Sequence, residues 1–116
     1  MNVEVFDLLD QLDKVSKPAF SVFNNLKYNR SEDNNITQYV PLEPMNKTEK
    51  ESLSRRIKEL KDVGLICNVK KEIKMEGNKA YIFKDPRKTY IINPEMLRCT
   101  NHDEAECLWS QCAKGE

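Results

Sequence analysis

The chain has 116 residues, of which 39% are hydrophobic and 33% are charged, and its 19 basic and 19 acidic residues cancel. This length predicts one domain with its own core, and no apolar run approaches the roughly 20 residues that a transmembrane helix needs. The acidic N-terminus lacks the basic segment of a secretory signal, so we expect a cytoplasmic protein whose four cysteines are reduced thiols or metal ligands.

The first part of the chain predicts two helices and a short strand. The first helix has apolar residues at helical spacing, at Val5, Leu8, Leu9, Leu12 and Val15. Ser16 is a favourable N-cap for a second helix, which ends near Tyr28. A polar loop over residues 29–35 and a β-prone run over residues 36–40 follow. Pro41 and Pro44 exclude a regular helix or central strand directly after that run.

A third helix is expected in the middle of the chain. Thr48 and Glu51 form the pattern of a capping box, in which each side chain bonds the backbone amide of the other residue. The helix that follows carries an apolar stripe and ends at Gly64, a residue type typical of helix ends. The stripe consists of Leu53, Ile57 and Leu60.

The last part predicts an antiparallel sheet and a C-terminal helix. We expect strands at residues 65–69, 73–75, 80–83 and 89–92, with turns at residues 76–78 and 85–88. Residues 103–113 are expected to form a helix with one apolar face, made of Ala105, Leu108, Trp109 and Cys112. The predicted fold class is therefore α+β, with a two- or three-stranded antiparallel sheet.

The positive charge is concentrated in a central block. Residues 46–90 carry a net charge of +6, and both ends of the chain are acidic. A helix fits the major groove of DNA, and a basic hairpin beside it reaches the backbone phosphates. A basic helix that leads directly into a basic hairpin therefore indicates a winged helix-turn-helix, although a solvated charged face would give the same pattern.

Two stretches resemble known DNA-binding families. Residues 54–66 (SRRIKELKDVGLI) are similar to the end of the recognition helix in winged-helix regulators. Residues 90–97 (YIINPEML) resemble the segment after the wing in RepL-type replication proteins of Gram-positive plasmids and related phage regulators. The resemblance covers about residues 16–97. The chain departs from the family at residues 41–45 (PLEPM), where a scaffold helix is usual.

The resemblance implies a winged-helix domain over residues 1–98, followed by a helical or Cys/His-containing tail over residues 99–116. It also implies sequence-specific binding of double-stranded DNA by a homodimer, in replication control or transcription regulation. We expect Arg55 to contact a base, because its guanidinium can bond guanine O6 and N7 together. The full set of candidate DNA-binding residues is Asn46, Lys47, Thr48, Lys50, Glu51, Arg55, Lys58, Lys70, Lys71, Lys74 and Lys79.

The tail offers a candidate zinc site. Cys99, His102, Cys107 and Cys112 have the spacing of a zinc knuckle, although the order of the ligand types differs. The alternative is a regular helix with buried thiols, which also shelters Trp109 and which we favour. No cofactor is required, and zinc is a possible one if the tail forms this site.

The sequence does not predict an enzyme. His102 is the single histidine, and the three glycines form no phosphate-binding loop. The neutral net charge and the acidic residues of the central helix favour one alternative, a phage-type module that binds and modulates a host protein. A buried ion pair between Glu51 and Arg55 would favour that alternative over DNA binding.

Overall fold

The computed structural model describes residues 13–113, so the predicted N-terminal helix lies outside the described residues apart from Val15. The described chain is α+β, as predicted. Its elements are α2 (Lys17–Tyr28), β1 (Ile36–Gln38), α3 (Lys47–Asp62), β2 (Ile66–Asn68), β3 (Glu72–Lys74), the 3₁₀ turn η1 (Glu76–Asn78), β4 (Ala80–Ile82), β5 (Thr89–Ile92) and α4 (His102–Ala113).

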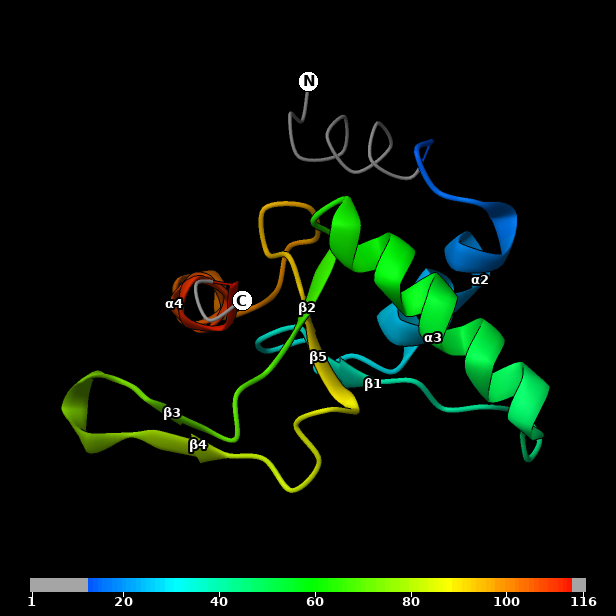
Figure 1. Cartoon of the computed structure of the whole chain (residues 1–116). Helices are drawn as coiled ribbons and strands as arrows, with labels where there is room; N and C mark the ends of the chain where they lie inside the picture. Colours follow the sequence, from blue (N-terminus) through cyan, green and yellow to red (C-terminus); the bar gives the residue numbers. More distant parts are fainter. Residues whose placement is uncertain (1–12, 114–116) are drawn as a thin grey trace.

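The strands form two antiparallel sheets. Three strands pair in the order β1-β5-β2, with Ile36 opposite Ile91 and Cys67 also opposite Ile91. β3 and β4 pair as a separate hairpin, which extends from the three-stranded sheet away from α3 (Figure 1). The hairpin turns at Gly77 and Asn78, whose φ angles of 76° and 65° explain the glycine and asparagine found there.

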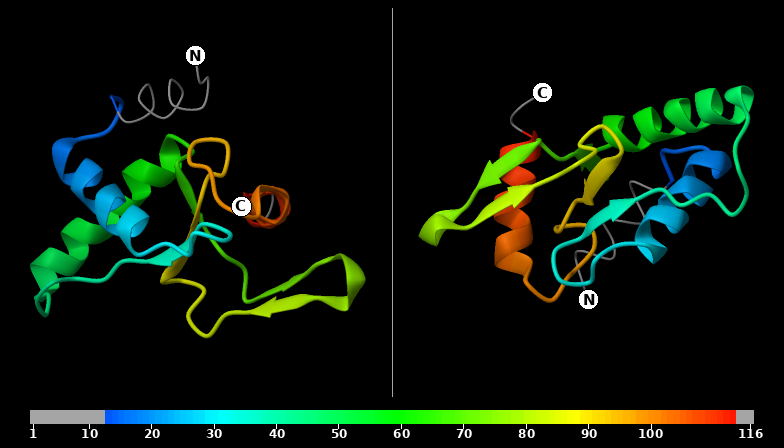
Figure 2. Two further views of the ribbon diagram at one scale, coloured as in Figure 1. Left: turned by 180° about the vertical axis from the view of Figure 1, so that it is seen from behind. Right: turned by 90° about the horizontal axis from the view of Figure 1, so that it is seen from below.

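Helices cover both faces of the three-stranded sheet, as the two views of Figure 2 show. Ile92 faces α2 and α3 and packs with Phe23, Leu26 and Leu60. Its neighbour Ile91 points the opposite way because side chains alternate along a strand, and it packs in a second core with α4. The sheet is therefore the middle layer of three.

The second helix begins and ends where the sequence predicts. Ser16 is the N-cap of α2, and its hydroxyl accepts a hydrogen bond from the amide of Ala19 at 3.3 Å. The same hydroxyl donates to Glu59 of α3 at 2.9 Å. One serine thus starts α2 and joins it to the last turns of α3.

The capping box predicted for α3 is wrong. The N-cap is Asn46, whose side-chain oxygen accepts from the amide of Glu49 at 2.8 Å. Asparagine caps a helix as well as threonine does, so the helix starts earlier and Thr48 lies inside its first turn. The predicted end is confirmed, because Gly64 follows the helix with a φ of 79°.

The coil between β1 and α3 contains no helix within its described residues 39–46, which agrees with the break expected from Pro41 and Pro44. α4 is a regular helix, as favoured from the sequence. Ala105, Leu108 and Cys112 are buried and Trp109 is partly buried, and they pack against the sheet and the hairpin. Among the described residues, no helix has the length and apolarity needed to cross a bilayer.

Candidate nucleic-acid interface

The exposed face of α3 is the first part of the candidate interface. Ile57 and Leu60 are buried, and Leu53 packs against the same core. These contacts direct the opposite face of the helix into solvent, where the helix wheel predicts it. All the candidate DNA-binding residues are exposed: Asn46, Lys47, Thr48, Lys50, Glu51, Arg55, Lys58, Lys70, Lys71, Lys74 and Lys79.

Two candidates have structural roles of their own. The Asn46 side chain caps α3, so its oxygen is already bonded to the amide of Glu49. Lys79, beside the hairpin turn, forms an ion pair with Glu104 of α4 at 3.3 Å while 68% of its side chain stays exposed. The pair joins the hairpin to α4. Lys70, Lys71 and Lys74 are therefore freer than Lys79 to contact a ligand.

The inner flank of α3 is fixed by Glu59. Its carboxylate accepts from Ser16 and also from Arg56, at 3.2 Å. The pKa of Glu59 lies below its ordinary value. The main cause is the hydrogen bond from Ser16, which, together with the hydrogen bond and charge of Arg56, outweighs the effect of desolvation. Arg56 is thereby held at the α2 side of the helix, away from the outward face that carries Arg55.

A groove lies on the other flank of α3, and sequence reasoning missed it. We call it the α3 groove; its volume is about 650 Å³, and α3, the coil after β1 and the turn at residues 85–88 enclose it. Its cationic side chains are Lys50, Lys61, Arg87 and Lys88, and its aromatic side chains are Tyr39 and Tyr90. No acidic residue of the described chain lines it.

The groove has defined walls. The Nζ atom of Lys61 lies 5.9 Å from the centroid of the Tyr90 ring, a cation–π contact. Burial raises the pKa of the Tyr90 hydroxyl above its ordinary value. The turn is held by Asn68, whose side-chain amide donates to the carbonyls of Pro86 and Arg87 at 3.2 and 3.0 Å. Arg87 and Lys88 thus extend from a fixed turn.

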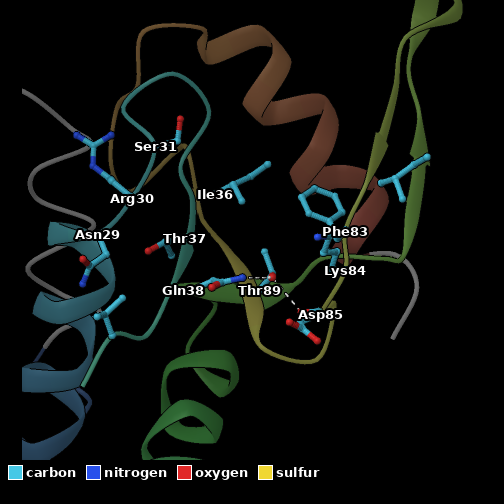
Figure 3. Close-up of a pocket in the computed structure, with 12 residues that line it drawn as sticks. Asn29, Arg30, Ser31, Ile36, Thr37, Gln38, Phe83, Lys84, Asp85 and Thr89 are labelled. Carbon is cyan, nitrogen blue, oxygen red and sulfur yellow. Dashed lines mark hydrogen bonds between the residues drawn. The ribbon is translucent and has the colours of Figure 1, made fainter. Parts of the chain in front are cut away.

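A second hollow, of about 530 Å³, lies between β1 and the end of β4 (Figure 3). Several of its polar groups are already bonded within the chain: Gln38 donates to Thr89 at 2.9 Å, and the Thr89 hydroxyl donates to the carbonyl of Asp85 at 2.9 Å. Arg30 donates to Asn35. Because its lining carries both charge signs and several of its polar atoms are bonded within the chain, this hollow is a weaker ligand site than the α3 groove.

The structure does not bring the four candidate zinc ligands together. Cys107 is exposed and Cys112 is buried, because residues five apart on a regular helix face different directions. His102 instead bonds Glu106 at 2.9 Å. Cys99 lies near Arg30 and Asp33, and burial raises its thiol pKa above the ordinary value. Among the described residues, no group of three metal-ligating side chains is close enough to hold an ion.

No protein-family model, curated protein or solved structure matches this chain. The function is therefore inferred from the chain's own residues and their arrangement.

Proposed function

We propose that the chain is a winged-helix protein that binds double-stranded DNA in a sequence-specific manner, in replication control or transcription regulation. α3 is the recognition helix and enters the major groove, where Arg55 contacts a base edge. The β3–β4 hairpin is the wing, and its lysines contact backbone phosphates. Lys47, Lys50 and Lys58 bind phosphates beside the helix.

The arrangement of the elements supports this proposal. A helix, a short strand, a second helix, the strand β2 and the β3–β4 hairpin follow one another, and the first strand lies against the last in the order β1-β5-β2. Such an arrangement leaves one helix and one hairpin projecting from a common sheet. The proposal requires that one duplex meets both, with a groove accepting the helix while the adjacent backbone meets the hairpin.

The observation that carries the proposal is the uncovered face of α3. Glu51 and Arg55 are both exposed, and these two described residues form no ion pair with each other. A buried Glu51–Arg55 pair, which would favour the module that binds a host protein, is thus not found among the described contacts. An arginine without a carboxylate partner on this face retains its donors for a base.

The coil at residues 39–46 gives this winged helix a distinctive feature. In a helix-turn-helix the helix before the recognition helix crosses the DNA backbone. Here a coil occupies that place, and Leu42 within it is fully exposed. We therefore expect fewer phosphate contacts before α3 and a larger share of the backbone contacts from the hairpin.

The proposal includes a homodimer, because a symmetric dimer doubles the recognised half-site. The apolar face of α4 already packs against its own chain, so α4 has only a polar face left for a partner subunit. Light scattering at tens of micromolar protein tests this: the mass of two chains is expected, and the mass of one chain would contradict the dimer.

The decisive experiment is selection of bound sequences from a random duplex pool, followed by anisotropy titrations of the selected site. We expect enrichment of one motif and an affinity that falls steeply with salt. Arg55→Ala should weaken binding and relax the preference at one base pair. Lys27→Ala, which removes an exposed charge from α2, is the matched control and should change little. No enrichment above background would overturn the proposal.

A further inference from the structure

The α3 groove combines cationic walls with an aromatic and apolar floor. We propose that it binds a single strand of nucleic acid, with one base against the floor and the flanking phosphates on the cations. This site goes beyond the proposed duplex binding, since it would hold nucleotides that are unpaired. Apart from Lys50, which belongs to both sites, it does not depend on the outward face of α3 that carries Arg55.

The charge of the groove points to a polyanion. Its four cations come from two separated segments, Lys50 and Lys61 from α3 and Arg87 and Lys88 from the turn. Within the described residues, none of the four forms an ion pair with a carboxylate. Four like charges around one hollow repel one another, so an anion that enters lowers the energy of all four.

The floor of the groove points to bases rather than to phosphate alone. The lining also includes the rings of Tyr39 and Tyr90 and the apolar side chains of Leu53 and Ile57, which are half-buried or buried, whereas Lys50, Arg87 and Lys88 are exposed. Phosphates of a closed duplex need only surface cations, whereas an unpaired base has an exposed face that stacks on tyrosine. A volume of about 650 Å³ is in the range of pockets that take small organic molecules, and a base is small enough to fit within it.

The groove is also preformed. Asn68 bonds the turn carbonyls, and Tyr39 packs against the core between α2 and α3. A ligand therefore finds walls that are already in position, which reduces the entropy lost on binding. An acidic protein segment would satisfy the cations but would make less use of two aromatic rings, so we favour the nucleic-acid strand.

The test is fluorescence anisotropy with a labelled oligo(dT) of about twelve nucleotides, a length in the range of single-strand binding sites. The full chain should bind it, with an affinity that falls with salt. The double variant Arg87→Ala, Lys88→Ala should bind roughly tenfold more weakly, and its log–log salt slope should be shallower by about 1.4, since each phosphate contact contributes about 0.7 for single strands.

The matched control is Lys17→Ala, Lys27→Ala, which removes two charges from exposed positions of α2 and should retain most of the affinity. Tyr39→Leu tests stacking, and it should weaken binding by roughly fivefold or more. Tyr39→Phe keeps the ring and should restore binding. Thermal unfolding of each variant identifies any that fails to fold, and methyl NMR of the wild-type chain should show shifts at Leu53 and Ile57 on addition of oligo(dT).

Four results would overturn the inference. The first two are the absence of salt-dependent oligo(dT) binding and an equal loss of oligo(dT) affinity in both double variants. The other two are displacement of oligo(dT) by poly-glutamate as readily as by unlabelled strand, and a change in oligomeric mass caused by Arg87→Ala, Lys88→Ala. The last would identify the groove as a contact between two copies. Failure of the proposed duplex binding is measured separately, as the absence of an enriched motif in the duplex selection.

Discussion

The two faces of the three-stranded sheet are covered by helices of opposite character. α3, on one face, carries six basic and four acidic residues, and its apolar stripe leaves a broad exposed surface. α4, on the other face, carries three acidic residues and no lysine or arginine. Both helices bury one side in the same way, so packing alone does not distinguish them. The difference in charge supports the proposed contact with nucleic acid on the α3 side, whereas α4 offers no lysine or arginine for such a contact.

The largest effect on stability is expected when core contacts are removed from each helix. Leu108→Ala in α4 and Leu60→Ala in α3 should each lower the free energy of unfolding by about 2–5 kcal/mol, because each leaves a cavity in a closed core. Urea denaturation measures both. A loss well under 1 kcal/mol for Leu108→Ala alone would show that α4 is a loosely attached tail rather than a third layer.

The next test separates base contacts from phosphate contacts on α3. Arg55→Ala should cost about 1–3 kcal/mol on the selected duplex and little on unrelated DNA. Lys58→Ala should weaken binding to all sequences alike and reduce the log–log salt slope by about 0.9. The same titrations with Glu106→Gln of α4 should remain at wild-type values. If Glu106→Gln changes binding as much as Lys58→Ala does, the proposed division between the two faces is wrong.

The link between α2 and α3 should be sensitive to pH. Ser16→Ala removes both the cap of α2 and a donor to Glu59, and loss of such a cap costs about 1 kcal/mol. Glu59→Gln removes only the charge. Because folding lowers the pKa of Glu59 from its ordinary value of 4.5, its stabilisation is present above that pH and is lost as pH falls through the lowered value.

Urea titrations at neutral pH and near pH 3 check the direction of this pH dependence. Glu59→Gln should be less stable than the wild type at neutral pH, and the two should converge in acid. A constant difference at both pH values would mean that the Glu59 side chain contributes through packing rather than through its charge.

A smaller effect is expected at the ion pair between the hairpin and α4. Lys79 is mostly exposed, so Lys79→Ala should lower the free energy of unfolding by less than about 1 kcal/mol. On the selected duplex it should have less effect than Lys74→Ala, since Glu104 already engages Lys79. An equal or larger loss of DNA affinity for Lys79→Ala would indicate that the pair opens on binding.

The smallest expected effect is that of metal removal. Since Cys107 and Cys112 lie on different sides of α4, EDTA should leave the unfolding midpoint unchanged, and protein purified without a tag should contain far less than one zinc per chain. Near-stoichiometric zinc would require α4 to break.

Local chemistry in the sequence predicted most of the elements. The cap at Ser16, the end at Gly64, the turn at Gly77 and Asn78 and the helix around Leu108 all depend on residues close in the chain. The start of α3 was misassigned because Asn46 and Thr48 are both good caps, and only the three-dimensional fold selects between them.

The candidate site was less predictable. The outward face of α3 follows from helical periodicity, so Arg55 and Lys58 could be assigned from spacing. The α3 groove joins residues of α3 with Tyr39 and with Arg87 and Lys88, which meet only because β5 lies beside β1. Runs of basic residues indicate charge, but they do not indicate which ones surround a common hollow.

The position of β5 at the centre of its sheet has a consequence for synthesis of the protein. β1 and β2 both pair with β5 and not with each other, so neither has a partner strand while the ribosome is still translating the residues before 89. Pairing over such separations is slow, because the intervening loop must close before the contacts form. The nascent chain therefore carries Ile66 and Cys67 without their sheet partners until β5 emerges, and formation of the sheet is expected to finish late. A ribosome stalled before β5 would display an incomplete sheet, which is the form of this protein most open to chaperones and proteases.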